Sequence, residues 1–229
     1  MFEVFRVNKS GRDFAVANVQ GCLAELRQML DLVAFDTTRD RLFSAGGMVN
    51  RGKSSAGVLA LLGEGYFHSV RGRQEQLLID HSRGLAQAQE VLEHGGQWFL
   101  ELGATARESV LRVLTSLPYA IEVATETEKI GIVHADCPKA DWRALPLGLA
   151  DEEVRHGCLF SDSRIERCDA TPVAGVNAVV VANMPLSAPV VLGNVHHIDT
   201  GVSYSRGYAT LLQLSPMLRI LNRPERRSA

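Results

Sequence analysis

The sequence has few cysteines, little net charge and no long apolar run, and each of these shortages excludes a class of protein. Its four cysteines show no C-x-x-C pair and no zinc-like spacing, which is typical of reduced thiols and not of a disulfide framework. No apolar run approaches the ~18 residues of a membrane helix, and the charged N-terminal segment does not follow the pattern of a signal peptide. We therefore expect a soluble, cytoplasmic protein with no membrane partner.

The charge balance excludes a further class of partner. The formal net charge is −2, and lysine and arginine are spread along the chain, so we expect no binding to nucleic acid. The one basic cluster is in the last residues, and we expect 223–229 to form a short solvated tail. The chain has 229 residues, 46% of them hydrophobic, which is enough for one sizeable core, and we expect a single domain over 1–222.

Three segments in the first third of the chain share one design, in which a short apolar strand ends in a polar loop that contains glycine. They are Asp13–Gly21, Leu42–Gly52 and Phe67–Glu75, and a helical pattern follows each of them. Proteins with alternating strands and helices place their sites at the C-terminal ends of the strands. We therefore expect the polar residues of these loops to lie together.

The rest of the pattern predicts an α/β (α+β) protein whose second half is richer in antiparallel strands. Phe2–Val7 and Asp13–Ala17 are expected to form an opening hairpin, and a second hairpin joins 119–124 to 129–133. Expected helices cover 23–34, 54–62, 74–82, 86–102 with an interruption at two glycines, and 105–114, followed by fragments near 140–145 and 151–156. Further strands are expected at 178–181, 190–192, 195–198, 208–214 and 218–221.

Five short motifs, in order along the chain, resemble those of a known family. They read VQGCLAEL, VNRG, SVRGRQEQ, GIVHAD and HIDTG. Over about Phe14 to Leu214 the chain resembles the bacterial and bacteriophage serine/threonine protein phosphatases of the calcineurin-like metallophosphoesterase superfamily. The resemblance implies a central β-sandwich flanked by helices, with two divalent metals such as manganese held on strand-end loops. In the family these metals lie about 3.5–4 Å apart, activate a bridging water and clamp the phosphate.

At the positions of the family's metal ligands, the sequence carries other residues. The resemblance places Asn18 at an aspartate ligand and Gln20 at a histidine ligand of the first loop. Gly47 takes the place of the aspartate that bridges both metals, and Arg73 takes that of an asparagine ligand. Asn183 stands where the family has its last histidine ligand. The resemblance therefore implies a metal site that is almost completely lost.

The positions that the resemblance assigns to proton transfer and phosphate binding are only partly kept. Gln74 replaces the histidine that acts as general acid, and Asn50 replaces the aspartate that orients it. His134 remains of the expected ligands, with Asp136 two residues later, and Arg51 remains of two arginines that contact phosphate. The other arginine aligns with Asp162 in this chain, although Arg164 is close enough to take its place.

A site of this composition does not suit two dications. Gly47 offers no ligand atom, and the amides of Asn18 and Gln20 are weak ligands without carboxylates to offset the metal charge. The guanidinium of Arg73 stays protonated and would repel a metal ion. We therefore expect no metal, no cofactor and no catalytic residue, and we interpret the protein as a pseudophosphatase.

The surviving arginines can still serve binding. Arg51 and Arg73 lie on neighbouring loops and are candidates for holding a phosphorylated or acidic segment of a protein partner in bacterial signalling, through paired N–H donors. In a competing interpretation Arg73 forms an ion pair with Glu75 or Asp136 and plugs the cavity. His134 is then a hydrogen-bonded core residue left from the original site.

Two further interpretations stay open at this stage. The protein could be an active phosphatase or phosphoesterase with a rebuilt site, in which His134, Asp136 and Asn18 hold one metal. It could also be a structural subunit that binds its partner away from the pocket, around the irregular segment 139–170.

Overall fold

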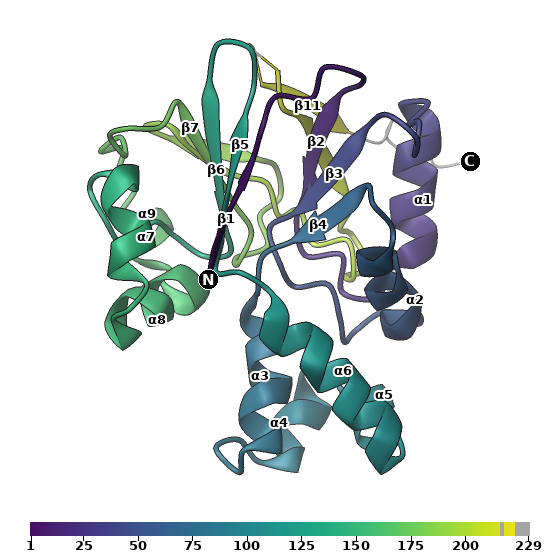
Figure 1. Cartoon of the computed structure of the whole chain (residues 1–229). Coiled ribbons are helices and arrows are strands. Elements are labelled where there is room, and N and C mark those ends of the chain that lie inside the picture. Colours follow the sequence, from purple (N-terminus) through teal and green to yellow (C-terminus); the bar gives the residue numbers. More distant parts are fainter. Residues whose placement is uncertain (216–217, 223–229) are drawn as a thin grey trace.

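The computed structural model describes residues 1–215 and 218–222, and it contains two β-sheets that face each other with helices on their outer sides (Figure 1). The first sheet has the order β1-β5-β6-β7-β9-β8, made of Phe2–Phe5, Ala120–Ala124, Lys129–Val133, Ala178–Val181, Val195–His197 and Val190–Leu192. The second has the order β11-β10-β2-β3-β4, made of Arg219–Asn222, Thr210–Gln213, Asp13–Val16, Arg41–Ser44 and Phe67–Ser69. The expected sandwich is confirmed.

Both sheets mix parallel and antiparallel pairs. In the second sheet β2, β3 and β4 are parallel, and β10 and β11 extend it in antiparallel pairing. In the first sheet β6, β7 and β9 are parallel, while β5 and β6 form the predicted hairpin and β8 pairs antiparallel with β9. The C-terminal ends of two parallel sets of strands are therefore available for a site.

The helices cover the outer faces of the sandwich and form a projecting unit. Figure 1 shows α7, α8 and α9 beside the first sheet, α1 and α2 beside the second, and α3 to α6 together at one end. Their bounds are α1 Leu23–Leu32, α2 Ser55–Ala60, η1 Leu61–Gly63, α3 Arg73–Ser82, α4 Ala88–Glu93, α5 Gln97–Leu100, α6 Ala104–Ser116, η2 Trp142–Ala144, α7 Leu145–Gly148, α8 Glu152–Phe160 and α9 Ser163–Glu166. The break between α4 and α5 falls at the two glycines, as predicted.

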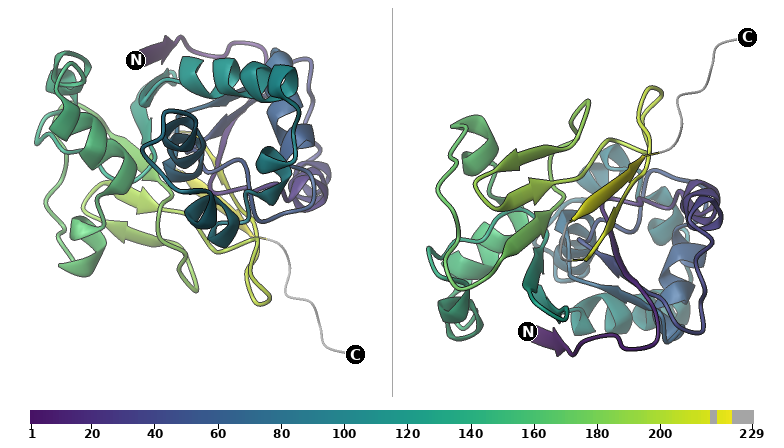
Figure 2. Two further views of the ribbon diagram at one scale, coloured as in Figure 1. Left: turned by 90° about the horizontal axis from the view of Figure 1, so that it is seen from below. Right: turned by 90° about the horizontal axis from the view of Figure 1, so that it is seen from above.

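Three apolar clusters fill the layers between these elements, because successive residues of a strand point to opposite faces. Phe43 of β3 and Ile132 of β6 belong to the cluster between the two sheets. Leu42 of β3 belongs to the cluster under α1, α2, α3 and α6. Trp142, which is 1% exposed, belongs to the cluster under α7 and α8. Figure 2 shows the sheets and helices that enclose these clusters, seen from below and from above.

The expected opening hairpin is wrong. β1 pairs in parallel with β5 in the first sheet, and β2 lies in the second sheet between β3 and β10. The turn itself exists, since the side chain of Asn8 accepts hydrogen bonds from the backbone N–H groups of Ser10 and Gly11. This turn moves the chain from one sheet to the other. All four residues of β2 are buried, which is typical of a strand with a neighbour on each side. Two of the four residues of β1 are exposed, which is typical of a strand at the edge of a sheet.

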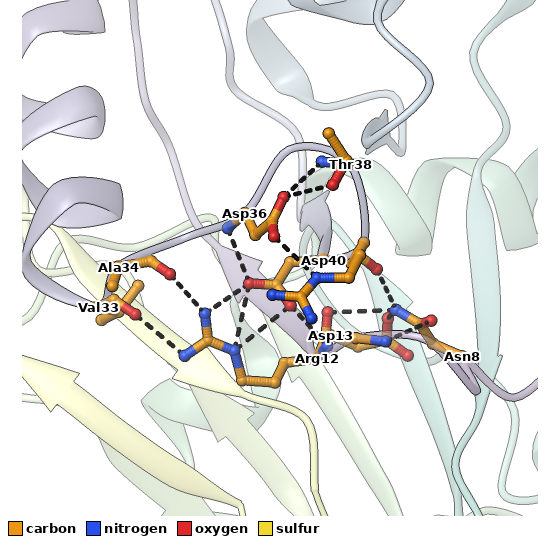
Figure 3. A network of polar contacts seen from close by, with 10 residues as sticks. Asn8, Arg12, Asp13, Val33, Ala34, Asp36, Thr38 and Asp40 are labelled. Carbon is orange, nitrogen blue, oxygen red and sulfur yellow. Dashed lines mark hydrogen bonds and ion pairs between the residues drawn. The ribbon is translucent and has the colours of Figure 1, made fainter.

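The edge of the second sheet where β2 and β3 begin is tied together by a polar network (Figure 3). The guanidinium of Arg12 lies 2.5 Å from the carboxylate of Asp40 and donates to the carbonyls of Val33 and Ala34, just after α1. A cation at this position also complements the partial negative charge of a helix C-terminus. These strand starts are opposite to the strand ends that carry the predicted site residues, and we assign the network a structural role.

The expected tail 223–229 lies outside the described residues. Within the described part, no helix has the length and apolarity required to cross a membrane. The single-domain boundary at 222 stays a prediction.

Candidate functional site

The loops that follow the two sets of parallel strands meet around one pocket of about 130 Å³. Seven of the residues predicted from the sequence line it, namely Asn18, Gln20, Arg51, Arg73, Gln74, His134 and Asn183. Gly47, Asn50 and Asp136 are not part of the lining, although the first two contact residues that are. The lining also includes His94, Pro185 and Tyr204, which the sequence did not indicate. The convergence expected of the strand-end loops is therefore observed.

Asn18 occupies the space into which a side chain at position 47 would project. Gly47 has a φ of +67°, and a Cβ built on it would lie 1.8 Å from the Oδ1 atom of Asn18. Asn18 itself adopts a left-handed conformation with φ 40°, which asparagine tolerates better than most residues. The two residues are therefore matched: the amide at 18 requires the absence of a side chain at 47.

The same amide is held by a buried carboxylate. Nδ2 of Asn18 donates to Asp199, and the other carboxylate oxygen of Asp199 accepts the backbone N–H of Gly201 at 2.8 Å. Asp199 is 2% exposed, and burial raises its pKa against the opposing effect of the Asn18 hydrogen bond. Asp199 belongs to the HIDTG motif, so this motif supports the first loop from the opposite sheet.

A fully buried carboxylate shapes the glycine loop. Glu75 of α3 is 0% exposed and accepts backbone N–H groups of Gly47 at 2.9 Å, Met48 at 2.7 Å and Gly72 at 2.8 Å. Burial raises the pKa of Glu75, and these N–H donors act against that rise. The carboxylate satisfies donors that would otherwise be buried without partners. Glu75 is therefore not available to Arg73, contrary to one of the expected ion pairs.

Arg73 begins α3 and reaches across the pocket to the segment that joins α8 to α9. Its Nη2 atom lies 3.6 Å from Oδ2 of Asp162 and donates to the carbonyl of Phe160 at 3.4 Å, while the guanidinium carbon lies 5.6 Å from the centre of the Phe160 ring. Asp162 also accepts a hydrogen bond from Asn183. The side chains of Arg73 and Asp162 are 38% and 28% exposed, so the pair is accessible to solvent. An ion pair of Arg73 was expected, but its partner is Asp162.

Asp136 is engaged elsewhere. Its carboxylate lies 2.8 Å from Nε of Arg164, and both residues are buried. Arg164 also donates to the carbonyls of Asp169 and Thr171. Neither residue lines the pocket. The suggestion that Arg164 could serve as the second phosphate-binding arginine is therefore wrong, and so is the pairing of Asp136 with Arg73.

His134 is a buried, neutral histidine. Its Nδ1 atom lies 2.8 Å from the carbonyl oxygen of Ala45, and the residue is 2% exposed. Because a carbonyl can only accept, the proton of the neutral ring is on Nδ1, and Nε2 is left as an acceptor. Burial lowers the pKa of His134 to about 4, so the ring carries no charge near pH 7. This agrees with the interpretation of His134 as a hydrogen-bonded core residue.

Two neutral amides face each other at the positions that the resemblance assigns to the general acid and its orienting group. Nδ2 of Asn50 donates to Oε1 of Gln74 at 2.6 Å, and Trp98 donates to Oδ1 of Asn50 at 3.2 Å. An amide side chain cannot deliver a proton as an imidazolium does. Neither side chain of this hydrogen-bonded pair is an acid.

Arg51 also lines the pocket and contacts the loop of Tyr204, which the sequence did not predict to lie there. Its guanidinium carbon lies 5.2 Å from the centre of the Tyr204 ring, and the neighbouring Ser203 donates to the side chain of Gln20 at 2.9 Å. A Cβ on Gly95, which has φ +80°, would lie 3.0 Å from Cα of Arg51, and this close approach brings His94 to the pocket. Among the described residues, no carboxylate lies within ion-pair distance of Arg51.

Three side-chain atoms of the lining are buried without a hydrogen-bond partner: Nε of Arg73, Nδ1 of His94 and Oδ1 of Asn183. Buried polar atoms are nearly always paired in native proteins, so each of these three atoms is an exception. The donors do not fit a pair of dications. Across the described residues, no three side chains of histidine, cysteine, aspartate or glutamate come together as metal ligands, and a guanidinium enters the pocket.

No protein-family model matches the chain, but comparison with individual proteins shows its family. Over 204 residues the sequence is 31% identical to serine/threonine-protein phosphatase 1 of Salmonella typhimurium, an alignment that covers 88% of this chain and 91% of that relative. The chain belongs to the bacterial serine/threonine protein phosphatases of the metallophosphoesterase superfamily. Serine/threonine-protein phosphatase 2 of Escherichia coli is 25% identical over 194 residues, covering 82% and 86% of the two chains.

The solved structures agree on the fold of this phosphatase homologue. A protein serine/threonine phosphatase from Saccharomyces cerevisiae matches with a TM-score of 0.64 at 10% sequence identity, over 97% of this chain and 84% of that one. At this identity the match concerns the fold alone. The calcineurin-like architecture that the motifs implied is therefore confirmed, while the chemistry of the pocket has to be argued from its own residues.

Proposed function

We propose that this phosphatase homologue is catalytically inactive and binds a phosphorylated or acidic segment of a protein partner in the pocket. The observation that carries the proposal is the position of Arg73. Its guanidinium enters the pocket from the place that the resemblance gives to a metal ligand and ends 3.6 Å from the carboxylate of Asp162. A permanent cation in the pocket can hold an anion, which has to compete with Asp162 for it, and the same cation is unfavourable for a dication.

Among the described residues, the side chains at the family's metal and general-acid positions do not supply the chemistry of hydrolysis. Hydrolysis of a phosphate monoester is among the slowest uncatalysed reactions, so a site needs both an activated nucleophile and charge stabilisation. Gln74 accepts a hydrogen bond from the amide of Asn50, and His134 is neutral with its proton directed to the backbone carbonyl of Ala45. Arg51 and Arg73 could stabilise charge, but stabilisation alone would leave the attacking water unactivated.

The size and polarity of the pocket support a single oxyanion as ligand. A volume of about 130 Å³ has room for several waters or one phosphate group, whereas pockets that enclose drug-sized molecules have roughly 300–1,000 Å³. The two guanidinium groups of Arg51 and Arg73 line the pocket and can offer paired N–H donors. A phosphorylated side chain that enters from the surface fits this space, with the rest of the partner outside.

A rebuilt, active metal site is the competing function, and the geometry gives it little support. That site would combine His134, Asp136 and Asn18. The carboxylate of Asp136 is instead bound to Arg164 at 2.8 Å and to the backbone N–H of Cys137 at 2.8 Å. Asn18 directs its Nδ2 donor to Asp199. Of the three residues, His134 and Asn18 line the pocket, and neither carries a carboxylate to offset the charge of a metal ion.

The first experiment tests the loss of activity and of metal. Metal content is measured on purified protein, and turnover of an aryl phosphate is followed with added manganese beside an active phosphatase of the same family. We expect no stoichiometric metal and no turnover above background. If the protein bound manganese, a concentration of 100 times the dissociation constant would stabilise it by about 2.7 kcal/mol and raise its melting temperature. Because we expect no binding, we expect no such rise. Phosphate release at enzyme-like rates, or a shift of several degrees, would contradict the proposal.

The second experiment tests the anion site. A phosphoserine peptide is titrated into wild-type protein, Arg51→Ala and Arg73→Ala, with Arg112→Ala on the remote helix α6 as the control for loss of one positive charge. Hydrogen bonds to a charged group are worth about 1.5–3 kcal/mol, so we expect each pocket variant to bind roughly 10- to 100-fold more weakly. Equal affinity across all four proteins would end the proposal and would direct attention to other surfaces, including 139–170.

A further inference from the structure

A second hollow adjoins the pocket and shares two residues with it. It has a volume of about 280 Å³, and Pro185 and Tyr204 line both spaces. The remaining walls include Leu186, Ser187, Thr200 and Arg206. A molecule anchored in the pocket therefore has an adjoining space into which it can continue, between the loops that follow β7 and β9.

These two loops are held against each other by hydrogen bonds, so the hollow is formed before any ligand arrives. The backbone N–H of Leu186 donates to the backbone carbonyl of Asp199 at 2.9 Å, and the hydroxyl of Tyr208 donates to the carbonyl of Ser187 at 3.4 Å. Gly207 packs so closely on Gly201 that an added Cβ would lie 1.5 Å from the Gly201 carbonyl oxygen. A preformed site loses less conformational entropy on binding than a flexible one.

The chemistry of the hollow differs from that of the pocket. Pro185, Leu186 and Tyr204 present apolar surface, and Tyr204 is 45% exposed although its ring lies beside the guanidinium of Arg51. Arg206 stands exposed at the same hollow, and no carboxylate of the described residues forms an ion pair with it. An apolar group and an anionic group would both find a complementary surface here.

We infer that this hollow is the subsite for the residues that flank the anionic side chain of the partner, and that it selects an apolar residue followed by an acidic one. The inference rests on the proposed anion site. Pocket and hollow share a wall, so an extended peptide with its phosphoserine between Arg51 and Arg73 places its next side chains over Pro185 and Tyr204. Arg206 then meets an acidic residue, and the positive charges along this path match an acidic segment.

The experiment compares a minimal ligand with longer ones. N-acetyl-phosphoserine amide occupies only the pocket, whereas phosphopeptides with Leu and Glu on the C-terminal or the N-terminal side also reach the hollow. Affinities are measured by calorimetry for wild-type protein and Arg206→Ala, with Arg112→Ala as the control. We expect one of the two peptides to bind at least 10-fold more tightly than the minimal ligand. Arg206→Ala should weaken that peptide about 3- to 10-fold and leave the minimal ligand unchanged.

The possible failures can be told apart. If neither the minimal ligand nor the peptides bind, the proposed function itself is wrong, and this inference falls with it. If the minimal ligand binds and the flanking residues or Arg206→Ala make no difference, the anion site stands and the subsite is refuted. A preference for a nucleotide such as ADP over every peptide would also overturn the inference, because it would assign the hollow to a base stacked on Tyr204.

Discussion

Removing the carboxylate of Asp162 should increase the affinity of the pocket for phosphate. Among the described residues, Asp162 is the one carboxylate in ion-pair contact with an arginine of the pocket, and it also accepts a hydrogen bond from Asn183. It lies at the N-terminal end of α9 without capping that helix, and its carboxylate meets Arg73 and Asn183, which line the pocket. A phosphate that binds Arg73 has to compete with this internal anion.

The expected gain follows from the geometry of the pair. The charged atoms are 3.6 Å apart, but both side chains are about one third exposed, and pairs of this kind contribute roughly 0.2–1 kcal/mol. Removing the carboxylate also removes its repulsion of a bound phosphate a few ångströms away, which is a contribution of similar size. Together they amount to about 0.4–2 kcal/mol, or roughly a 2- to 30-fold increase in affinity.

Calorimetric titration with inorganic phosphate or a phosphopeptide tests this estimate. Asp162→Asn removes the charge and keeps an oxygen that can accept from Asn183, while Asp162→Ala removes both. Glu108→Gln, on the exposed face of α6, changes the net charge equally and serves as the control. We expect both Asp162 variants to bind more tightly and the control to match wild type. Weaker binding by Asp162→Asn would refute the argument, because it would mean that Asp162 positions Arg73 for the ligand and does not compete with it.

Three predictions concern stability. Glu75→Gln replaces one acceptor oxygen by a donor that faces backbone N–H groups, so we expect a loss of about 2–4 kcal/mol in urea unfolding; a loss under 0.5 kcal/mol would contradict this. Asp136→Ala leaves Arg164 buried and unpaired and should cost about 3–5 kcal/mol, whereas additional Arg164→Met should recover part of that loss. The pKa of His134 is lowered to about 4, below the ~6.5 of an unfolded histidine, so the unfolded chain binds the proton first and stability should fall as the pH drops from about 6.5 towards 4. Urea unfolding at pH 7 and pH 5 checks this: the free energy of unfolding should decrease less in His134→Asn than in wild type, and an equal decrease would speak against it.

Much of the fold could be predicted because its signals are local. The helix expected at 74–82 spans Arg73–Ser82, and the hairpin expected at 119–133 forms from β5 and β6. The glycine-containing loops after the strands indicated where the polar residues would gather, because parallel strands end at a common edge of the sheet. The order of strands within each sheet carries no such local signal. For that reason the turn at Asn8–Gly11 was identified while the partner of the first strand was not.

The partners of the charged side chains were the least predictable part of the site. Arg73 meets Asp162, which lies in another helix-flanking segment of the opposite half of the sandwich. A carboxylate much closer in sequence, Glu75, is excluded because it binds backbone donors in the core. Tyr204 and His94 reach the pocket through the shapes of their loops, and a single sequence does not reveal which loop will fold over a site. Ion pairs and loop placement depend on the completed tertiary structure.

The substitutions at the pocket depend on one another and do not act as independent losses. An aspartate at position 47 would have to project into the space that the Asn18 amide already fills. An aspartate at position 18 would place a second carboxylate beside the buried Asp199, with no donor between them. Two carboxylates in such contact cannot both ionise without a compensating cation. Restoring either acid alone would therefore lower stability before it provided a ligand.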